Sequence, residues 1–463
     1  IIELYLSGNF SAIVTTLKIL QESFVIPYID QEIEISIERL GSHGEGIGYW
    51  NGFTLFVENA LPEERVKAKI YERRKNYGRA KIIEYLQVSS SRNTPLCPLF
   101  GECGGCQLMH LEYSKQLETK RQRVVDALER IGKIFDSKVF PCEPSVPFGY
   151  RNKIQMPVDM GRLGLYARNT HDLVEIERCF IHCDLGETTF KHIQEIIKKY
   201  PLSEKVKHIL IRTAVHTKQV LVIFVTTSDD YSHLFPLVEK LMGAQGEIKG
   251  VIQNINPAES NVILSHQYRT LAGLGWMEEK LLGLTFKVSP ASFFQVNPAQ
   301  AEKLYQKVVE FSALTGKEIV LDAYCGVGTL SLILAEHAKE IIGVECVNEA
   351  IIDAKENAER NHISNAKFTC DYAEKFVSTL TKIDIAILNP PRKGCESSFL
   401  EKLVQLKPSR IVYVSCDPAT LARDLSFLCS KGYCIEAVQP FDMFPQTSHV
   451  ECVVKLIFAP KSN

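Results

Sequence analysis

Cys416 stands at the junction of two segments that differ in character. The β-branched and aromatic run before it, residues 411–414, is typical of a buried strand. Asp417 suits the N-cap of a helix and Pro418 its first position, so a helix is predicted from Ala419 onward. A helix N-terminus carries partial positive charge, which favours a thiolate. Cys416 is therefore a candidate nucleophile, although a buried structural cysteine would give the same pattern.

A carboxylate and a polar strand end extend this candidate chemistry. Glu451 stands where the last predicted strand begins. In a cleft it could act as a general base, and a solvated surface acid is the alternative. The apolar run "IDIAIL" leads into Asn389 and two prolines, which would hold a rigid hydrogen-bonding group at a cleft mouth. Asn-Pro-Pro before an aromatic residue would indicate methylation of an exocyclic base amine, but Arg392 occupies the place of that ring.

A glycine turn between two predicted strands indicates a cofactor site. Gly326 and Gly328 would let the backbone approach a ligand closely, and Glu345, which ends the second strand, is placed to bind ribose hydroxyls. Ser331 occupies the place of the third glycine of the dinucleotide fingerprint, which argues against NAD. Asp322, at the end of the first strand, suits the cationic methionine moiety of S-adenosylmethionine.

These three features together match one reaction. Carbon 5 of uracil is too poor a nucleophile to take a methyl group directly. A thiolate that adds to carbon 6 converts the ring into an enolate, which can attack a sulfonium methyl group, and a base then removes the proton from carbon 5. The reaction needs an activated cysteine, a carboxylate and a fold that binds S-adenosylmethionine, and the last third of the chain has a candidate for each.

The composition places these residues in a soluble globular protein. The chain has 463 residues, of which 45% are hydrophobic and 23% charged, enough for about three domains. With a net charge of -2, any surface that binds nucleic acid must be local. Fourteen cysteines without a secretory signal indicate a reducing compartment, so we expect a cytoplasmic location. No apolar run reaches membrane length, so no membrane partner is expected.

Three domains are predicted after an uninformative segment, 1–27. Short alternating runs separated by glycines predict a small β-barrel over 28–88. The segment 89–287 has mixed character. From 288–463, apolar strands alternate with helical patterns, which predicts an α/β domain of the Rossmann type.

Two further clusters suggest ligands. Between Arg65 and Lys81, eight Lys and Arg residues are interleaved with tyrosines, a mixture that holds single-stranded nucleic acid, although a solvated charged face is the alternative. Cys97, Cys103 and Cys106 give the spacing C-x5-C-x2-C, with two glycines that free backbone N–H groups to face sulfur. With one distant ligand, this spacing suits a [4Fe–4S] cluster and zinc equally well.

Several stretches resemble the RNA 5-methyluridine methyltransferases: "YVSCDPATLARDL", "FPQTSHVE", "SPASFFQVNPAQAEKLY", "LDAYCGVGTL" and "LNPPRKG". The barrel, similar to an OB-fold, resembles the TRAM domain of that family. The stretch "CPLFGECGGCQLMH" resembles the iron–sulfur signature of the branch that acts on large-subunit ribosomal RNA. The resemblance covers about residues 28–459.

The resemblance implies a site. It implies Cys416 as the nucleophile and Glu451 as the base that abstracts the proton. It implies contacts to S-adenosylmethionine from Gln295, Tyr324, Thr329, Glu345, Asp371 and Asn389. It favours iron–sulfur over zinc, with ligands Cys97, Cys103, Cys106 and a fourth expected at Cys179, for which Cys183 is the rival. It also implies an RNA substrate, with ribosomal RNA favoured and transfer RNA the alternative, for an enzyme that we expect to be a monomer.

Two departures from the family pattern keep other functions open. Asn389 stands where the family usually has Asp, and Asp417 where it usually has Asn. An amine-directed methyltransferase could use residues 389–391, which would leave Cys416 without a role. An RNA-binding protein that has lost catalysis is the other alternative, because Asn389 lacks the usual charge.

Overall fold

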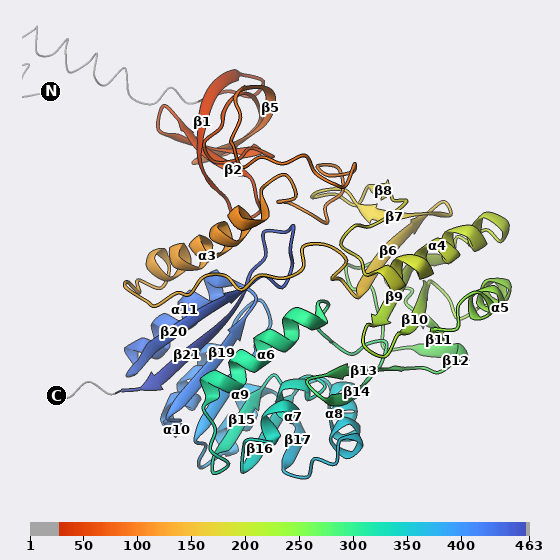
Figure 1. Ribbon diagram of the computed structural model, residues 1–463, viewed down its shortest axis with the longest axis vertical. Helices are drawn as coiled ribbons and strands as arrows, with labels where there is room; N and C mark the ends of the chain where they lie inside the picture. Colours follow the sequence, from red (N-terminus) through yellow and green to blue (C-terminus); the bar gives the residue numbers. More distant parts are fainter. Residues whose placement is uncertain (1–26, 460–463) are drawn as a thin grey trace, which may run out of the picture. The chain divides into compact units, whose positions relative to one another are not determined.

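The computed structural model describes residues 27–459, traced from red to blue in Figure 1. They form two compact units. The first holds the described residues up to Gly101, with Cys106–Gln116 and Gln446–Ser448. The second holds Glu102–Gly105, Leu117–Pro445 and the described residues from His449 onward. Residues 1–26, nearly all of the uninformative segment 1–27, lie outside the described residues, and the three predicted domain boundaries stay a prediction.

Five strands of the first unit close the predicted barrel. They are β1 (Glu32–Leu40), β2 (Gly46–Trp50), β3 (Phe53–Glu58), β4 (Arg65–Arg73) and β5 (Tyr77–Gln87), in the order β1-β2-β3-β5-β4. Ile33, Ile35 and Ile37 alternate with polar residues along β1 and are buried in the barrel core. A Cβ on Gly48 would lie 2.3 Å from the backbone oxygen of Ser36, so the close approach of β1 and β2 requires glycine there.

A mixed seven-stranded sheet forms the middle of the second unit, in the order β12-β11-β10-β9-β6-β7-β8. Its strands are β6 (Lys153–Asp159), β7 (Arg162–Tyr166), β8 (Leu173–Glu175), β9 (Val206–Ala214), β10 (Gln219–Thr226), β11 (Ile248–Ile255) and β12 (Tyr268–Gly273). The accompanying helices are α4 (Asp184–Lys199), η1 (Ser232–Leu234) and α5 (Phe235–Ala244). A hairpin of β13 (Met277–Leu281) and β14 (Leu284–Val288) follows.

The second seven-stranded sheet of this unit has the order β17-β16-β15-β18-β19-β21-β20. Its strands are β15 (Ile319–Ala323), β16 (Glu340–Glu345), β17 (Ala366–Cys370), β18 (Ile385–Leu388), β19 (Arg410–Ser415), β20 (Tyr433–Phe441) and β21 (Glu451–Phe458). The first four pairings along this order, from β17 to β19, connect parallel strands, whereas β21 runs antiparallel to both β19 and β20. This is the α/β sheet that the sequence predicted.

Helices cover both faces of this sheet (Figure 1). The helices are α3 (Tyr113–Arg130), α6 (Pro298–Ser312), α7 (Thr329–Ala335), α8 (Asn348–Arg360), α9 (Ala373–Phe376), η2 (Val377–Thr379), α10 (Ser397–Leu406) and α11 (Pro418–Ser430). Apolar residues of α6, α7 and α8 share a core with Val320 of β15, whereas those of α10, α11 and the second half of α3 share a core with Leu321. Because successive side chains of a strand point to opposite faces, each buried strand contributes to both cores.

The topology determines where a site can form. The strand order reverses at β15, and open α/β sheets bind ligands beyond the carboxyl ends of the strands at such a point. Because β21 is antiparallel, its first residue lies at the same edge as the last residues of its parallel neighbours. None of the helices within residues 27–459 is both long and apolar enough to cross a lipid bilayer.

Candidate active site

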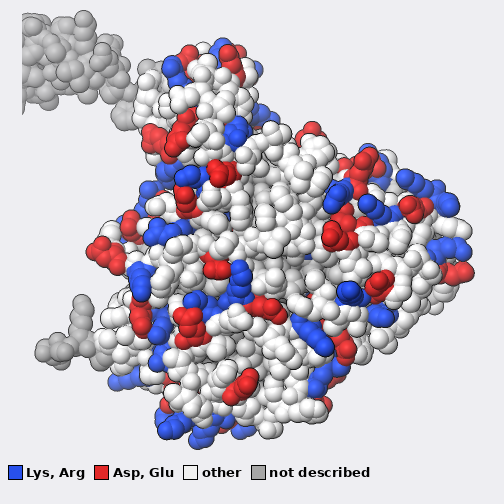
Figure 2. Space-filling view, viewed as in Figure 1, with Lys and Arg blue, Asp and Glu red and all other residues white. Residues whose placement is uncertain are grey.

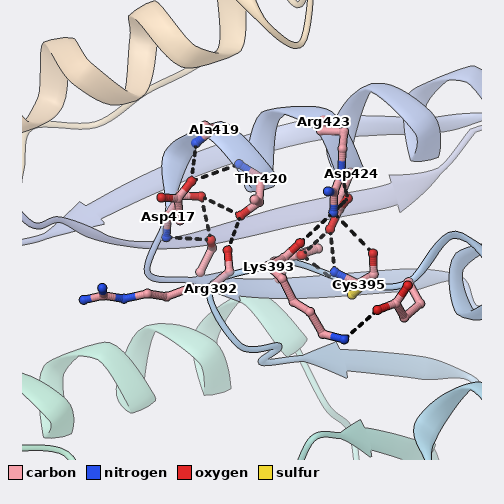
Figure 3. Close-up of polar contacts among 11 residues, drawn as sticks. Arg392, Lys393, Cys395, Asp417, Ala419, Thr420, Arg423 and Asp424 are labelled. Atoms are coloured by element: carbon pink, nitrogen blue, oxygen red, sulfur yellow. Dashed lines mark hydrogen bonds and ion pairs between the residues drawn. The ribbon is translucent and has the colours of Figure 1, made fainter. Parts of the chain in front are cut away.

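Cys416 lies between the end of β19 and the start of α11, as predicted. Asp417 caps the helix: its Oδ1 accepts hydrogen bonds from the backbone N–H groups of Ala419, at 2.9 Å, and Thr420, at 3.0 Å (Figure 3). Pro418 takes the first helical position. A cap of this kind stabilises a helix by about 1 kcal/mol. The Asp at position 417 therefore performs the capping that its sequence position predicted.

Glu451 is brought to Cys416 by the pairing of β19 with β21. Ser415 is the register partner of Cys452, so the residues beside them, Cys416 and Glu451, meet at the carboxyl edge of the sheet. Glu451 is only 6% exposed, and this burial raises its pKa to about 7. A solvated surface acid, the alternative open from sequence, is not what the structure shows.

The Cys416 thiol differs from the sequence expectation in its resting charge. A helix N-terminus favours a thiolate, but burial and, to a smaller extent, the negative charge of Glu451 raise the pKa of this thiol to about 11. Removal of the surrounding water outweighs the helix dipole here. Cys416 therefore rests as a thiol and needs activation during the reaction.

Arg392 opposes this effect of burial and was not predicted as a functional residue from the sequence. Its positive charge lowers the pKa of both Cys416 and Glu451, against the effect of burial. The side chain is exposed and follows β18 by four residues. A sequence signal for this residue did exist. Two prolines at a strand end restrict the backbone, and Arg392 is the cation that directly follows them. It was considered there only as a replacement for an aromatic ring.

Asn389 follows β18 directly, at the point where the strand order reverses. Its backbone N–H donates to the carbonyl oxygen of Ala323 at 3.4 Å, which ties the ends of β18 and β15 together. The side chain is half-buried, and within residues 27–459 it forms no hydrogen bond. Its amide is thus available to a ligand in the crevice, both as a donor and as an acceptor.

The glycine turn after β15 has the form that the sequence predicted. Gly326 and Gly328 both have positive φ, and a Cβ on Gly328 would lie 2.9 Å from the ring of Phe368. Ser331, in the place of the third fingerprint glycine, donates a hydrogen bond to Oδ2 of Asp322 at 2.5 Å. The other carboxylate oxygen of Asp322 is buried and has no partner among the described residues. A buried carboxylate with an unpartnered oxygen fits the cationic methionine end of S-adenosylmethionine.

Burial also raises the pKa of Asp322 to about 7, and the neighbouring charge of Glu345 adds to the shift. Glu345 itself ends β16, where its carboxylate accepts hydrogen bonds from the backbone N–H groups of Gly326, at 3.2 Å, and Val347, at 3.1 Å. The carboxylate is therefore already oriented at the carboxyl edge. Asp371 lies beside it, because the Asp371 N–H donates to the carbonyl oxygen of Glu345 at 3.0 Å.

Three predicted cofactor residues remain, and each is buried or packed near the glycine turn or α6. Thr329 is buried as the first residue of α7, next to the glycine turn. Tyr324 has a left-handed backbone, with φ of 66°, and its ring packs on Phe399, with ring centroids 5.7 Å apart. Gln295 is buried ahead of α6.

Tyr305 of α6 connects the two halves of the site and was also missed. It is buried, bonds to the side chain of Gln295, and its pKa is raised by burial and by the charges of Glu451 and Asp322. It therefore stays protonated and can donate a hydrogen bond between the catalytic and cofactor residues. A tyrosine on the apolar face of a helix carries no sequence signal of such a role.

A cavity of about 600 Å³ opens beside the glycine turn. Gly326, Glu345 and Val347 form one wall, and Tyr268 and Trp276 contribute to the other. Its size lies within the range of small-molecule sites. Among the predicted cofactor residues of the described chain, Glu345 alone lines this cavity, so it extends from the ribose end of the predicted cofactor site.

The four cysteines predicted to bind a cluster are divided between the two units. Cys97 and Cys106 belong to the first unit, and Cys103 and Cys179 to the second. All four are half-buried. In the part of the chain that the structure describes, no group of three or more His, Cys, Asp or Glu residues is placed to hold a metal ion.

Within the second unit, two of these cysteines have surroundings that suit thiolate ligands. The N–H of Gly105 donates to Sγ of Cys103 at 3.4 Å, as the two glycines predicted. Burial raises the pKa of Cys179 to about 11, N–H groups that follow it oppose the shift, and Cys103 is close enough to add to it. Cys183, the rival ligand, is instead buried as the N-cap of α4, beside Thr213. The proximity to Cys103 favours Cys179.

The basic segment of the barrel is partly neutralised by its own fold. Lys67 pairs with Glu32 at 2.6 Å and Lys69 with Asp30 at 2.8 Å, so two cations of β4 are paired with acids at the start of β1 and just before it. Figure 2 likewise shows Lys and Arg interspersed with Asp and Glu over the face in view. The predicted surface for RNA is therefore a mixed surface, and its affinity depends on ring contacts as well as on charge.

Comparison with known proteins agrees with this geometry. The family model described as tRNA (uracil-5-)-methyltransferase matches residues 277–458, and that of the TRAM domain matches residues 28–83. Uncharacterized RNA methyltransferases of Clostridium acetobutylicum and Listeria innocua are each 41% identical to this chain, over 444 and 443 residues. These alignments cover 92% of this chain and 96% and 98% of the two relatives.

One solved structure is similar over nearly the whole chain. It is the tRNA (uracil-54, C5)-methyltransferase of Pyrococcus abyssi in complex with S-adenosyl-L-homocysteine, which is 27% identical with a TM-score of 0.74. The match covers 91% of this chain and 99% of that protein.

Proposed function

Because the chain belongs to the TRAM-containing family of S-adenosylmethionine-dependent RNA uracil-5-methyltransferases, we propose that it methylates carbon 5 of uracil in RNA. One observation carries the proposal: Cys416, Glu451 and Arg392 interact with one another at the sheet edge that also holds the glycine turn. A nucleophile, a base and a cation beside a cofactor site are what carbon 5 chemistry requires.

Cys416 begins the reaction. Its thiol, which is only half-buried, gives up its proton to solvent water, and Sγ adds to carbon 6 of the uracil, which moves the ring π electrons onto the carbonyl at position 4. The charge of Arg392 favours the thiolate and so lowers the barrier to addition. The Asn389 amide can donate to that carbonyl and accept from the N–H at ring position 3. The usual Asp can only accept, so we infer that Asn389 is compatible with uracil.

S-adenosylmethionine, when bound, supplies an electrophilic methyl group on a cationic sulfur. We assign its contacts to Gln295, Tyr324, Thr329, Glu345, Asp371 and Asn389. The unpartnered oxygen of Asp322 supports a cation at this place, and the oriented carboxylate of Glu345 supports ribose hydroxyls.

Glu451 ends the reaction. It accepts the proton of carbon 5, the electrons of that bond restore the double bond between carbons 5 and 6, and the Cys416 thiolate leaves. A base acts best when its pKa is near the working pH, and burial raises the pKa of Glu451 to about 7.

The target RNA is a finer part of the proposal. We favour large-subunit ribosomal RNA, because the stretch "CPLFGECGGCQLMH" resembles the signature of that branch. Transfer RNA is the alternative, and the solved relative from Pyrococcus abyssi is named for that substrate.

RNA that contains 5-fluorouridine tests the proposal. A base can remove a proton from carbon 5 but cannot remove fluorine in the same way. The adduct with Cys416 is therefore expected to persist after methyl transfer. Transcripts of large-subunit ribosomal RNA and of transfer RNA are synthesised with 5-fluorouridine in place of uridine, so that they carry no enzymatic modification. They are then incubated with the protein and labelled S-adenosylmethionine. We expect a labelled protein–RNA adduct that survives denaturation and maps to Cys416. Label on an exocyclic amine without an adduct would establish an amine methyltransferase, and RNA binding without any label an inactive relative.

We also propose a [4Fe–4S] cluster on Cys97, Cys103, Cys106 and Cys179, supported by their spacing and by the N–H donors around Cys103 and Cys179. Protein purified without oxygen is then expected to be brown and to carry about four iron atoms per chain. Cys179→Ala should lose the iron, whereas the matched control Cys183→Ala should retain it. Colourless anaerobic protein with one tightly bound zinc would contradict the cluster, and the opposite result for the two variants would reassign the fourth ligand.

A further inference from the structure

A buried carboxylate on α11 joins three elements around the reaction centre (Figure 3). Asp424 is 2% exposed. Its Oδ2 accepts hydrogen bonds from the Tyr413 hydroxyl of β19, at 2.6 Å, and from the N–H of Cys395, at 2.8 Å. Its Oδ1 pairs with Nε of Arg423 at 2.8 Å. Helix, strand and the loop after β18 thus converge on one side chain.

Arg423 holds the same loop from its other side. Its Nη2 donates to the carbonyl oxygens of Lys393, at 3.0 Å, and Cys395, at 3.3 Å. Between these two residues, Gly394 has φ of +77°, and a Cβ there would lie 2.6 Å from Nη2 of Arg423 and 2.7 Å from Oδ2 of Asp424. A side chain does not fit at this position, so glycine lets the loop backbone pack directly against Arg423 and Asp424.

The Tyr413 hydroxyl keeps the proton that it donates to Asp424, because burial holds its pKa well above its usual value. Removing one member of a buried charged network leaves its partners without hydrogen bonds. This costs more free energy than the loss of an exposed hydrogen bond. The anchor is therefore rigid.

The anchored loop carries the cation of the reaction centre. Backbone contacts fix Arg392, whose carbonyl oxygen accepts a hydrogen bond from Oγ1 of Thr420 at 3.1 Å. The Arg392 guanidinium forms no hydrogen bond within residues 27–459, so these backbone contacts set the point from which its side chain extends. That charge acts on both Cys416 and Glu451.

We propose that Asp424 and Arg423 are positioning residues for methyl transfer, which hold the loop so that Arg392 acts on Cys416 and Glu451. The inference rests on the proposed function. It assigns to α11 a second role beyond placing the nucleophile at its N-terminus, because residues about two turns further along the same helix hold the loop of the cation that acts on this nucleophile.

Asp424→Asn and Thr420→Val test this role. The first keeps the shape of the anchor and removes its charge, and the second removes the bond to the Arg392 carbonyl. Glu396→Gln is the matched control, because it breaks the exposed Lys393–Glu396 pair beside the same loop. The measurements are the single-turnover rate at which free methylated RNA is released from unmodified transcripts, taken about every half unit of pH between about pH 5.5 and 9, and the dissociation constant of S-adenosylmethionine.

The pH profile separates positioning from loss of stability. Arg392 lowers the pKa of Cys416 and of Glu451, and both groups react deprotonated, so a displaced Arg392 moves the acidic limb to higher pH. The other titratable groups that act on this pair are Asp417, Tyr305 and Cys452. None of them is altered by the substitutions. A smaller folded fraction would lower the rate without moving the midpoint.

We expect Asp424→Asn to slow transfer about tenfold or more and Thr420→Val about threefold, both with a raised midpoint and an unchanged cofactor affinity. Glu396→Gln should stay within about twofold of wild type. Unchanged rates and midpoints in both loop variants would overturn the inference. If Asp424→Asn does not fold, as judged by circular dichroism, the rate and midpoint of Thr420→Val alone test the inference. A wild-type protein that methylates no uracil would refute the proposed function instead, before any variant is compared.

Discussion

Replacing Cys416 by serine is expected to abolish methyl transfer, with a loss of at least about a thousandfold in the single-turnover rate. A serine hydroxyl is far less acidic than a thiol, and its site is one where burial already raises the pKa of the thiol to about 11. Arg392 cannot offset so large a difference. The measurement is transfer of labelled methyl groups to unmodified ribosomal and transfer RNA transcripts.

Two controls make this result specific. The dissociation constant of S-adenosylmethionine should change by less than about twofold, because the proposed cofactor contacts lie on other strand ends. Cys434→Ser, which alters an exposed cysteine of β20, should keep wild-type activity. Turnover of Cys416→Ser within about tenfold of wild type would rule out the covalent mechanism.

Replacing Glu451 by glutamine is expected to trap the reaction halfway. Addition of Cys416 to carbon 6 does not need the carboxylate, and removal of its negative charge lowers the pKa of the thiol. Release does need a base, so overall turnover should fall by about two to four orders of magnitude. A methylated protein–RNA complex should therefore accumulate and survive denaturing electrophoresis, where wild type shows only a trace.

The pH dependence of release tests the same role of Glu451. Burial raises the pKa of Glu451 to about 7, so the group is protonated, and useless as a base, below that pH. In wild type, release should slow as the pH falls through about 7, and Glu451→Gln should lack this limb. Glu436→Gln, an exposed acid paired with Lys455, is the matched control and should behave as wild type. A Glu451→Gln variant that turns over without accumulating adduct would assign the base elsewhere.

Local signals predicted the parts of the site that lie within one junction. The strand that ends at Ser415, the cap at Asp417 and the turn at Gly326 each depend on neighbours in the chain, and the structure has all of them. The alternation of isoleucines along β1 predicted the barrel for the same reason. Such features involve a few consecutive residues, whose preferences are readable from sequence.

Tertiary contacts account for what the sequence did not predict. The thiolate expected at Cys416 is a thiol, because burial and Glu451 together outweigh the helix dipole, and neither is a local property. The roles of Arg392 and Tyr305 depend on chain segments that come together only in the folded sheet. The cysteine set remains a prediction, because its members are divided between two compact units.

The position of β21 has a consequence for how the two halves of the reaction depend on the sheet. This strand lies between β19 and β20, so β20 joins the sheet only through it. Cys416 follows β19, whose parallel neighbour is β18, whereas Glu451 comes beside it only through the antiparallel pairing of β21. Because addition needs Cys416 and release needs Glu451, we expect a change that loosens β21 to leave the protein able to form the covalent bond to RNA but slow to release it.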